Sequence, residues 1–199
     1  MKMEKRLLLI GALMPIIYFT IVVIAGLLNP EFSHIREAGS ELGRIGAPYI
    51  WKEAYNIALA VAGFLGVLGG LGLFYGLQKI GFGKVFMILA SLTVIMPSIN
   101  LMLSGINPLP HPYHSFLEII FPAFFAPLFA ALIAKRLIGS IAIVNILMIG
   151  FVANIIIFAG IPGFGNYVAE DYLGLWLRIW SIITMLSMGY MCWIVRERL

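Results

Sequence analysis

The sequence predicts an all-α fold, a polytopic membrane helix bundle of six transmembrane helices with a short interfacial helix in the first outer loop. The first observation behind this prediction is composition, because 62% of the 199 residues are hydrophobic and only 11% are charged. A soluble domain usually carries about 25% charged residues, so lipid must surround most of this chain. The second observation is the length of the apolar runs, and the third is the placement of the basic residues.

Six apolar runs are long enough to cross a bilayer, for which about 20 residues suffice. Each must be helical, because lipid offers no partner to a backbone N–H or C=O group. Pro97, Pro122, Pro127 and Gly150 fall within the third to fifth runs, where kinks are expected. The runs make up a single integral membrane domain over residues 1–199, and they cover about 7–28, 55–77, 85–106, 115–134, 137–159 and 172–195.

The basic residues divide unequally between the two sides of the predicted membrane. Nine Lys and Arg residues lie on the side of the two termini, and four lie on the other side. Because basic residues favour the cytoplasm, we expect a multi-pass protein of the cell membrane with cytoplasmic N- and C-termini. The apolar stretch of the first run is longer than the core of about 7–15 residues in a signal peptide, so this run is kept as a helix.

Composition also excludes some functional classes. The net charge of +4 is spread over short clusters between apolar runs, so nucleic acid is not an expected partner. The single cysteine, Cys192, excludes an intrachain disulfide and a multi-cysteine metal site. Membrane lipids are the expected partners, and an oligomer is compatible with the sequence.

The first outer connection, residues 29–54, carries an amphipathic pattern. Asn29 is a favourable N-cap residue and Pro30 suits the first position of a helix. Apolar residues then recur at helical spacing, at Phe32, Ile35, Leu42 and Ile45. This pattern predicts a helix over residues 31–42 that lies at the membrane surface and covers the mouth of the bundle.

Polar side chains gather at the depth of the outer helix ends. Because polar groups in lipid need partners, they predict one polar pocket that opens outward. Arg178 is the only basic residue inside a run, and snorkelling to the head groups is its alternative role. The polar residues at this depth are Glu53, Asn56, Asn100, His114, Glu118, Asn154 and Arg178.

A metal site is a weaker interpretation of the same region. His111, His114 and Glu118 are spaced i, i+3, i+7, and imidazole and carboxylate groups bind several metals. No motif such as H-E-x-x-H accompanies them. We therefore predict no metal site.

Three segments resemble a known family. Ser40-Glu41-Leu42-Gly43 is followed by Gly46-Ala47-Pro48, His114 opens the fourth run, and Gly174-Leu175-Trp176-Leu177-Arg178 begins the last. In this order they resemble the domain-of-unknown-function family 998, six-helix membrane proteins of archaea and bacteria. That family is distantly similar to eukaryotic GPI-lipid-remodelling membrane proteins. The G-x-F-P-x-D stretch often found before the histidine reads here Gly105-Ile106-Asn107-Pro108, without the acid. The resemblance implies no established activity, but it singles out Ser40, Glu41, His114 and Arg178.

The expected function is the binding or modification of a lipid or amphiphile at the outward-facing pocket. A guanidinium, an imidazole and a carboxylate at head-group depth would clamp a phosphate and move protons. No nucleophile motif is present, so whether the chain is an enzyme stays open, and no catalytic residue or cofactor follows from the sequence. The candidate ligand-binding residues are Ser40, Glu41, Asn56, His114, Glu118 and Arg178.

Three alternatives remain at this point. A small transporter or channel would need a polar path through the inner half, where Asn145 alone is available. A haem protein would use His34 and His114 as axial ligands. A structural membrane subunit would use the glycine-rich stretch 66–72 for close helix packing, although packing within one chain is the simpler role of that stretch.

Overall fold

A computed structural model describes residues 2–160 and 170–199, and these residues form helices and loops without a β-strand. Six helices are long and apolar enough to cross a membrane. Five are continuous: α1 (Met3–Leu28), α2 (Lys52–Ile80), α3 (Lys84–Ile106), α6 (Ile141–Gly160) and α7 (Leu173–Glu197). The predicted fold class is confirmed, and the ends of the helices differ from those of the predicted runs by up to four residues.

The fourth span is broken near its start. It consists of α4 (Leu117–Ile120), the 3-10 turn η2 (Phe121–Phe125) and α5 (Ala126–Leu137). Pro122 and Pro127 lie at the beginning of η2 and α5. A proline has no N–H for the helical ladder, so the chain changes from α-helix to 3-10 geometry between them. The break agrees with the kink expected from these prolines.

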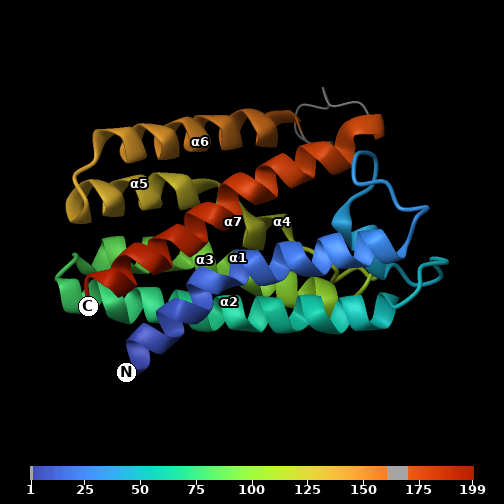
Figure 1. Cartoon of the computed structure of the whole chain (residues 1–199), viewed down its shortest axis with the longest axis horizontal. Helices are drawn as coiled ribbons and strands as arrows, with labels where there is room; N and C mark the ends of the chain where they lie inside the picture. Colours follow the sequence, from blue (N-terminus) through green and yellow to red (C-terminus); the bar gives the residue numbers. More distant parts are fainter. Residues whose placement is uncertain (1, 161–169) are drawn as a thin grey trace.

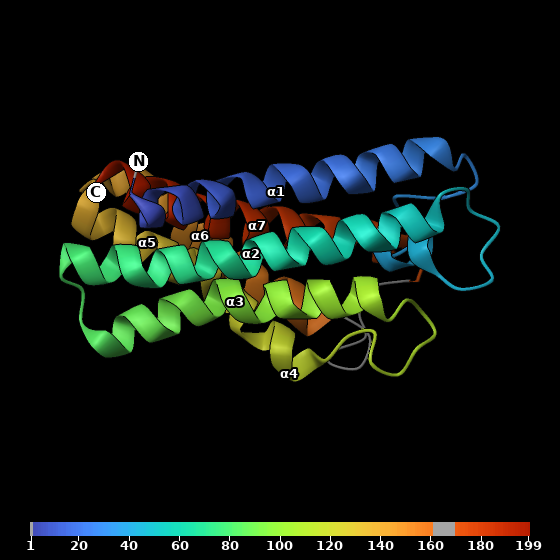
Figure 2. The ribbon, with the colours of Figure 1, turned by 90° about the horizontal axis from the view of Figure 1, so that it is seen from below.

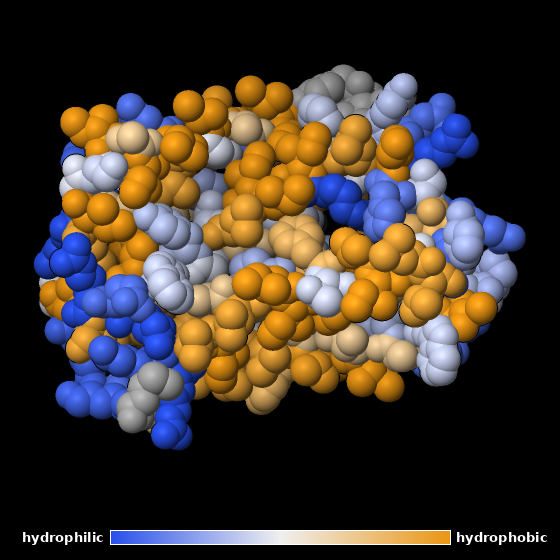
Figure 3. Space-filling view, in the orientation of Figure 1, coloured by the Kyte–Doolittle hydropathy of each residue, from blue (hydrophilic) through white to orange (hydrophobic). Residues whose placement is uncertain are grey.

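The helices lie lengthwise in one bundle (Figure 1). In the view from below, α1, α2 and α3 lie side by side in front of α5, α6 and α7 (Figure 2). Both termini are at one end, here called the terminal end, and the connections 29–51 and 107–116 are at the other, called the loop end (Figure 1). A hydrophobic band covers the middle of the molecule, and hydrophilic residues gather toward its two ends (Figure 3). This is the surface expected of a protein that lipid surrounds.

Glycines allow α2 to pack closely against its neighbours. A Cβ on Gly69 would overlap the backbone of Gly11 in α1, and one on Gly70 would overlap the side chain of Ile95 in α3. Small residues at such crossings let helix backbones approach each other. The glycine-rich stretch thus packs helices within the chain, as expected.

Helix α6 is the least buried span. Only 11% of its apolar window is buried, compared with 56% for α7. It packs on α5 and α7 and leaves most of its apolar surface open. Figure 1 shows α6 along the edge of the bundle.

The predicted interfacial helix over residues 31–42 is wrong in extent. The first connection is irregular except for the 3-10 helix η1 (Gly39–Gly43). Phe32 and Leu42 are buried, but Ile35 and Ile45, which the helical pattern placed with them, are exposed. The backbone is held by bonds to other parts of the molecule instead of by a helical ladder, for example by the Leu175 N–H donated to the Ile35 carbonyl. The connection between α6 and α7 lies mostly outside the described residues.

Candidate functional site

Asn29 closes the first connection into a loop. Its side-chain amide donates to the Ala25 carbonyl at 2.7 Å, and its Oδ1 accepts the backbone N–H of Ile50 at 2.7 Å. Asn29 is only 5% exposed, and satisfied buried amides of this kind hold loop ends in one arrangement. The N-cap predicted for a following helix therefore serves as a clasp between the two ends of the loop.

Glu37 organises the inside of this loop. Its carboxylate accepts the backbone N–H of Ser33 at 2.6 Å and the hydroxyl of Tyr49 at 2.8 Å. Burial and this negatively charged partner raise the pKa of Tyr49 to about 12. Glu37 thus bonds two neutral donors and joins two parts of the loop.

Arg178 points from α7 into the underside of the first connection. Its Nη2 lies 3.4 Å from the Glu37 carbonyl oxygen, and its guanidinium carbon lies 5.8 Å from the centre of the Phe32 ring. The guanidinium therefore faces protein, and it does not extend along α7 toward lipid as snorkelling would require. Arg178 is half-buried.

The charge of Arg178 has few partners among the described side chains. No described carboxylate lies within 4.0 Å of it. Its Nε is buried and has no hydrogen-bond partner there. A guanidinium has five N–H donors, so most of its bonding capacity is unused by the part of the chain that the structure describes.

Gly39 and Tyr55 border the same guanidinium. A Cβ placed on Gly39 would lie 3.7 Å from Arg178 Nη1 and 3.5 Å from the Tyr55 hydroxyl oxygen. Tyr55 donates its hydroxyl hydrogen to the Gly39 carbonyl at 2.8 Å, and the oxygen keeps lone pairs as acceptors. We call the set Phe32, Glu37, Gly39, Tyr55 and Arg178 the guanidinium site.

Glu41 pairs with Arg44 and not with Arg178, the arginine that we expected in the same site. Arg44 donates its Nε to Glu41 Oε2 at 2.5 Å and its Nη2 to Glu41 Oε1 at 2.7 Å. This two-fold contact raises the pKa of Arg44. Ser40, next to Glu41, is half-buried, and its hydroxyl has no hydrogen bond with the described residues. The pairing leaves Arg178 without Glu41 as its counter-ion.

His114 is held at the end of α3. Its Nδ1 lies 2.9 Å from the Asn107 carbonyl oxygen, and its own carbonyl accepts the hydroxyl hydrogen of Ser104 at 2.6 Å. Burial is the main cause of a lowered pKa for His114, which is 8% exposed. The charge of Glu41 opposes this shift, so Glu41 and His114 are close enough to influence each other electrostatically.

Asn56 and Glu118, the other two predicted site residues, differ in their surroundings. Asn56 donates its side-chain amide to the Gly43 carbonyl at 2.9 Å, and a Cβ on Gly43 would overlap that amide. Glu118 is exposed on α4, and it makes no hydrogen bond or ion pair with the described residues. Asn56 therefore holds the η1 turn in place, whereas the Glu118 carboxylate is not bonded to any described residue.

Two deeper asparagines of the predicted pocket form hydrogen bonds to neighbouring segments. Asn100 accepts the backbone N–H of Phe116 at 2.8 Å, and Asn154 donates to the Thr184 hydroxyl at 3.1 Å between α6 and α7. Glu53 is exposed. These residues join helices and connections, and no contact places them at the guanidinium site.

The three histidines are held in separate surroundings. The His34 ring packs edge-on against Phe32 at 5.0 Å and fills the space beside Gly26 of α1. Burial and the charge of Arg178 lower the pKa of His34. His111 is exposed and bonds to the backbone of Tyr113. Within residues 2–160 and 170–199, no three His, Cys, Asp or Glu side chains gather as metal ligands would.

The loop end thus contains two groups of polar residues. Glu41, Arg44 and His114 form one, and the guanidinium site forms the other. Glu37, Tyr49 and Tyr55 were not among the predicted site residues, although a tyrosine in the first turn of a span, such as Tyr55, is a signal of interfacial bonding. A guanidinium with unused donors beside a tyrosine hydroxyl can bind an oxyanion, such as a phosphate or a carboxylate.

Comparisons agree with this picture of a helical membrane protein without an assigned reaction. The family model described as "Protein of unknown function (DUF998)" matches residues 12–194. Comparison with curated proteins and with solved structures gives no match. The match covers nearly the whole chain, including η1, His114 and the start of α7, so the chain belongs to the DUF998 family of proteins of unknown function.

Proposed function

We propose that this chain binds an anionic amphiphile at its loop end, with the phosphate of a lipid head group held by Arg178. The observation that carries this proposal is the half-buried guanidinium, which has no described carboxylate within 4.0 Å and has an Nε without a partner. A cation held in partly apolar surroundings favours an anion that replaces its lost water. Phosphate oxygens match the planar donors of arginine.

The surroundings of Arg178 also support a lipid as the source of the anion. Phe32 packs beside the guanidinium, and the apolar cluster beneath it contains Val22, Leu42 and Leu59. An amphiphile would place its charged group at Arg178 and its chains along the apolar surface of the spans. With both termini in the cytoplasm, the site would serve the outer leaflet.

The test measures binding of a short-chain phosphatidylglycerol to purified protein in neutral detergent by calorimetry. Arg178→Gln should raise the Kd at least about tenfold, because a charge-assisted hydrogen bond contributes about 1.5–3 kcal/mol. Arg36→Gln is the matched control. Arg36 also lies at the loop end, but it is exposed and its ion pair with Asp171 spans 3.8 Å, so its removal should change the Kd by less than about threefold.

Three outcomes would overturn parts of the proposal. Equal binding by Arg178→Gln and the unchanged protein would remove Arg178 from the site. Equal affinity for a short-chain phosphatidylcholine would exclude selection of an anion. If inorganic phosphate competes at the same concentration as phosphatidylglycerol, the ligand is a free oxyanion and the lipid is excluded.

A further inference from the structure

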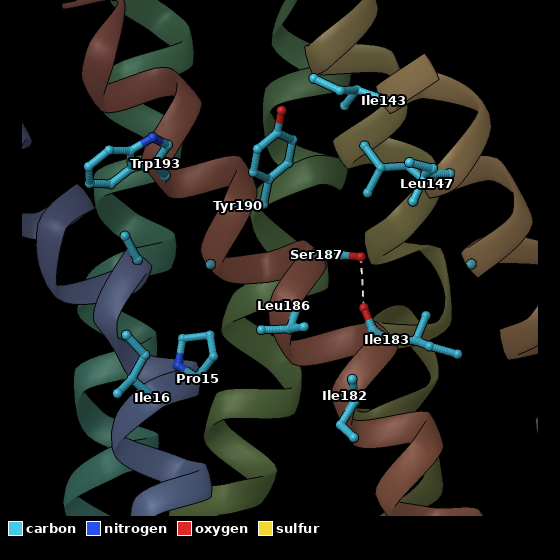
Figure 4. Close-up of a pocket in the computed structure, with 14 residues that line it drawn as sticks. Pro15, Ile16, Ile143, Leu147, Ile182, Ile183, Leu186, Ser187, Tyr190 and Trp193 are labelled. Atoms are coloured by element: carbon cyan, nitrogen blue, oxygen red, sulfur yellow. Dashed lines mark hydrogen bonds between the residues drawn. The ribbon is translucent and has the colours of Figure 1, made fainter. Parts of the chain in front are cut away.

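A long apolar groove runs along the side of the bundle at the terminal end. It lies between α1, α6 and α7 and encloses about 680 Å³. Figure 4 shows Ile16 on α1, Leu147 on α6 and Leu186 on α7 around it. Its volume is within the range of about 300–1,000 Å³ that is typical of small-molecule sites.

The groove is about as long as one leaflet of a membrane is thick. From Ile182 to Trp193, its limits on α7, the helix rises about 16 Å at about 1.5 Å per residue. Half of a hydrocarbon core of about 30 Å is about 15 Å. An acyl chain from one leaflet fits this length.

The lining offers almost no hydrogen bonds deep in the groove. The Ser187 hydroxyl, its polar group near the middle, already donates to the Ile183 carbonyl at 2.7 Å (Figure 4). The occupant must therefore be apolar over most of its length. The position of α6 at the edge of the bundle leaves the groove open to lipid.

Polar groups occur at the end of the groove nearest the termini. Trp193 is 48% exposed, and the guanidinium carbon of Arg196 lies 5.7 Å from the centre of its ring. Tryptophan and tyrosine gather at head-group depth, and the Tyr190 hydroxyl is directed toward the Trp193 end of the groove (Figure 4). Arg196 donates to Glu197 through Nη1 at 2.6 Å, but its Nε is buried without a partner among the described residues.

The charge at this end favours an anion. Lys5 and Arg6 lie at the start of α1, and Arg196 and Arg198 lie at the end of α7. These are two of the three helices that border the groove. A phosphate bound beside Trp193 would therefore lie close to Arg196, with further basic residues at the same membrane surface.

We propose that this groove binds one acyl chain of an anionic glycerophospholipid from the leaflet at the terminal end, with the lipid phosphate at Arg196. The site is independent of the guanidinium site, because it lies at the opposite end of the bundle and shares no residue with it. Cytoplasmic termini would make this lipid one of the inner leaflet.

The first experiment counts retained lipids by native mass spectrometry after reconstitution with equal amounts of phosphatidylglycerol and phosphatidylcholine. The unchanged protein should retain one phosphatidylglycerol in the groove, in addition to the one proposed at Arg178. Ala12→Phe and Ile16→Phe fill the groove from α1 and should each lower retention of this second lipid about tenfold. Ala142→Phe adds the same bulk to an exposed position of α6 outside the groove, so its retention should equal that of the unchanged protein.

The charged end is tested by two arginine variants. Arg196→Gln should lower the preference of the groove for phosphatidylglycerol about tenfold, the size expected for one charge-assisted hydrogen bond, while the lipid proposed at Arg178 is still retained. Arg198→Gln removes the same charge two residues away at an exposed position and should leave the preference within about twofold. Because these variants leave Arg178 in place, they separate this site from the one at the loop end.

Several results would overturn the inference. The first is that the unchanged protein and both groove-filling variants retain lipid equally. The second is that the unchanged protein retains phosphatidylglycerol and phosphatidylcholine equally. The third is that Arg196→Gln and Arg198→Gln lose the preference for phosphatidylglycerol to the same extent. A dimer without lipid, which the groove-filling variants convert to a monomer, would show instead that a second copy of the chain covers the groove.

Discussion

Replacing Gly174 with alanine adds one methyl group at the point where the first connection packs on the start of α7. The added Cβ would lie 2.5 Å from the Glu37 carbonyl oxygen and 2.8 Å from the His34 carbonyl oxygen. Both oxygens belong to the backbone, so neither can turn away as a flexible side chain would. The connection must therefore move away from α7.

The magnitude follows from the contacts that this movement disturbs. Overpacking of one methyl group costs about 1–3 kcal/mol. The hydrogen bond from the Leu175 N–H to the Ile35 carbonyl, 2.8 Å long, is lost on opening in both proteins, so it reports the opening but does not add to the difference. We expect Gly174→Ala to favour the opened connection by about 2 kcal/mol, which is roughly a 30-fold change in the equilibrium.

Hydrogen exchange of the Leu175 amide in detergent measures this opening directly. Its protection should fall about 30-fold in Gly174→Ala, the factor that corresponds to 2 kcal/mol. Gly83→Ala is the control, because a Cβ on Gly83 meets no atom within 4 Å. If Leu175 is equally protected in Gly174→Ala and in the unchanged protein, the connection does not dock on α7 as described.

Two further predictions concern pH and topology. Burial lowers the pKa of His34 and His114, so the unfolded state takes up protons first as the pH falls through about 6.5, and stability should be lost below that pH. The thermal midpoint should therefore decrease when the pH is lowered from 7.5 to 5.5, about one unit on either side of the ordinary histidine pKa. The decrease should be smaller in the His34→Gln, His114→Gln double variant, and unchanged in a His111→Gln control. A double variant with the same decrease as the unchanged protein would refute the assignment. For topology, an impermeant thiol reagent applied to whole cells should label Glu31→Cys but not Gly83→Cys, and the opposite labelling would place the termini outside.

The helices of this protein could be predicted from sequence because lipid imposes a local rule. A segment surrounded by hydrocarbon must satisfy its own backbone, so each apolar run becomes a helix wherever it packs. The proline pair at Pro122 and Pro127 acts equally locally, because a missing N–H interrupts the ladder in any fold. These features need no knowledge of which helices are neighbours.

The connection after α1 depended on tertiary contacts, and for that reason helical spacing was misleading there. Residues outside the hydrocarbon can bond to any nearby group, and Asn29 bonds to Ile50, which lies 21 positions away. The depth of Arg178 was evident from sequence, but its neighbours were not. Glu41, a predicted member of the same site, is next to Arg44 in space, and Arg178 instead meets the backbone of Glu37 and the Tyr55–Gly39 pair.

The groove at the terminal end was decided by tertiary structure alone. The sequence of α6 is apolar apart from Asn145 and Asn154, and its apolar residues do not gather on one face. Its place at the edge of the bundle follows from packing on α5 and α7, which leaves Leu147 on one wall of an open space and Ile16 of α1 on the other. In lipid, exposed and buried faces of a helix can be equally apolar, so hydrophobic pattern identifies the spans but does not reveal which of their surfaces meet.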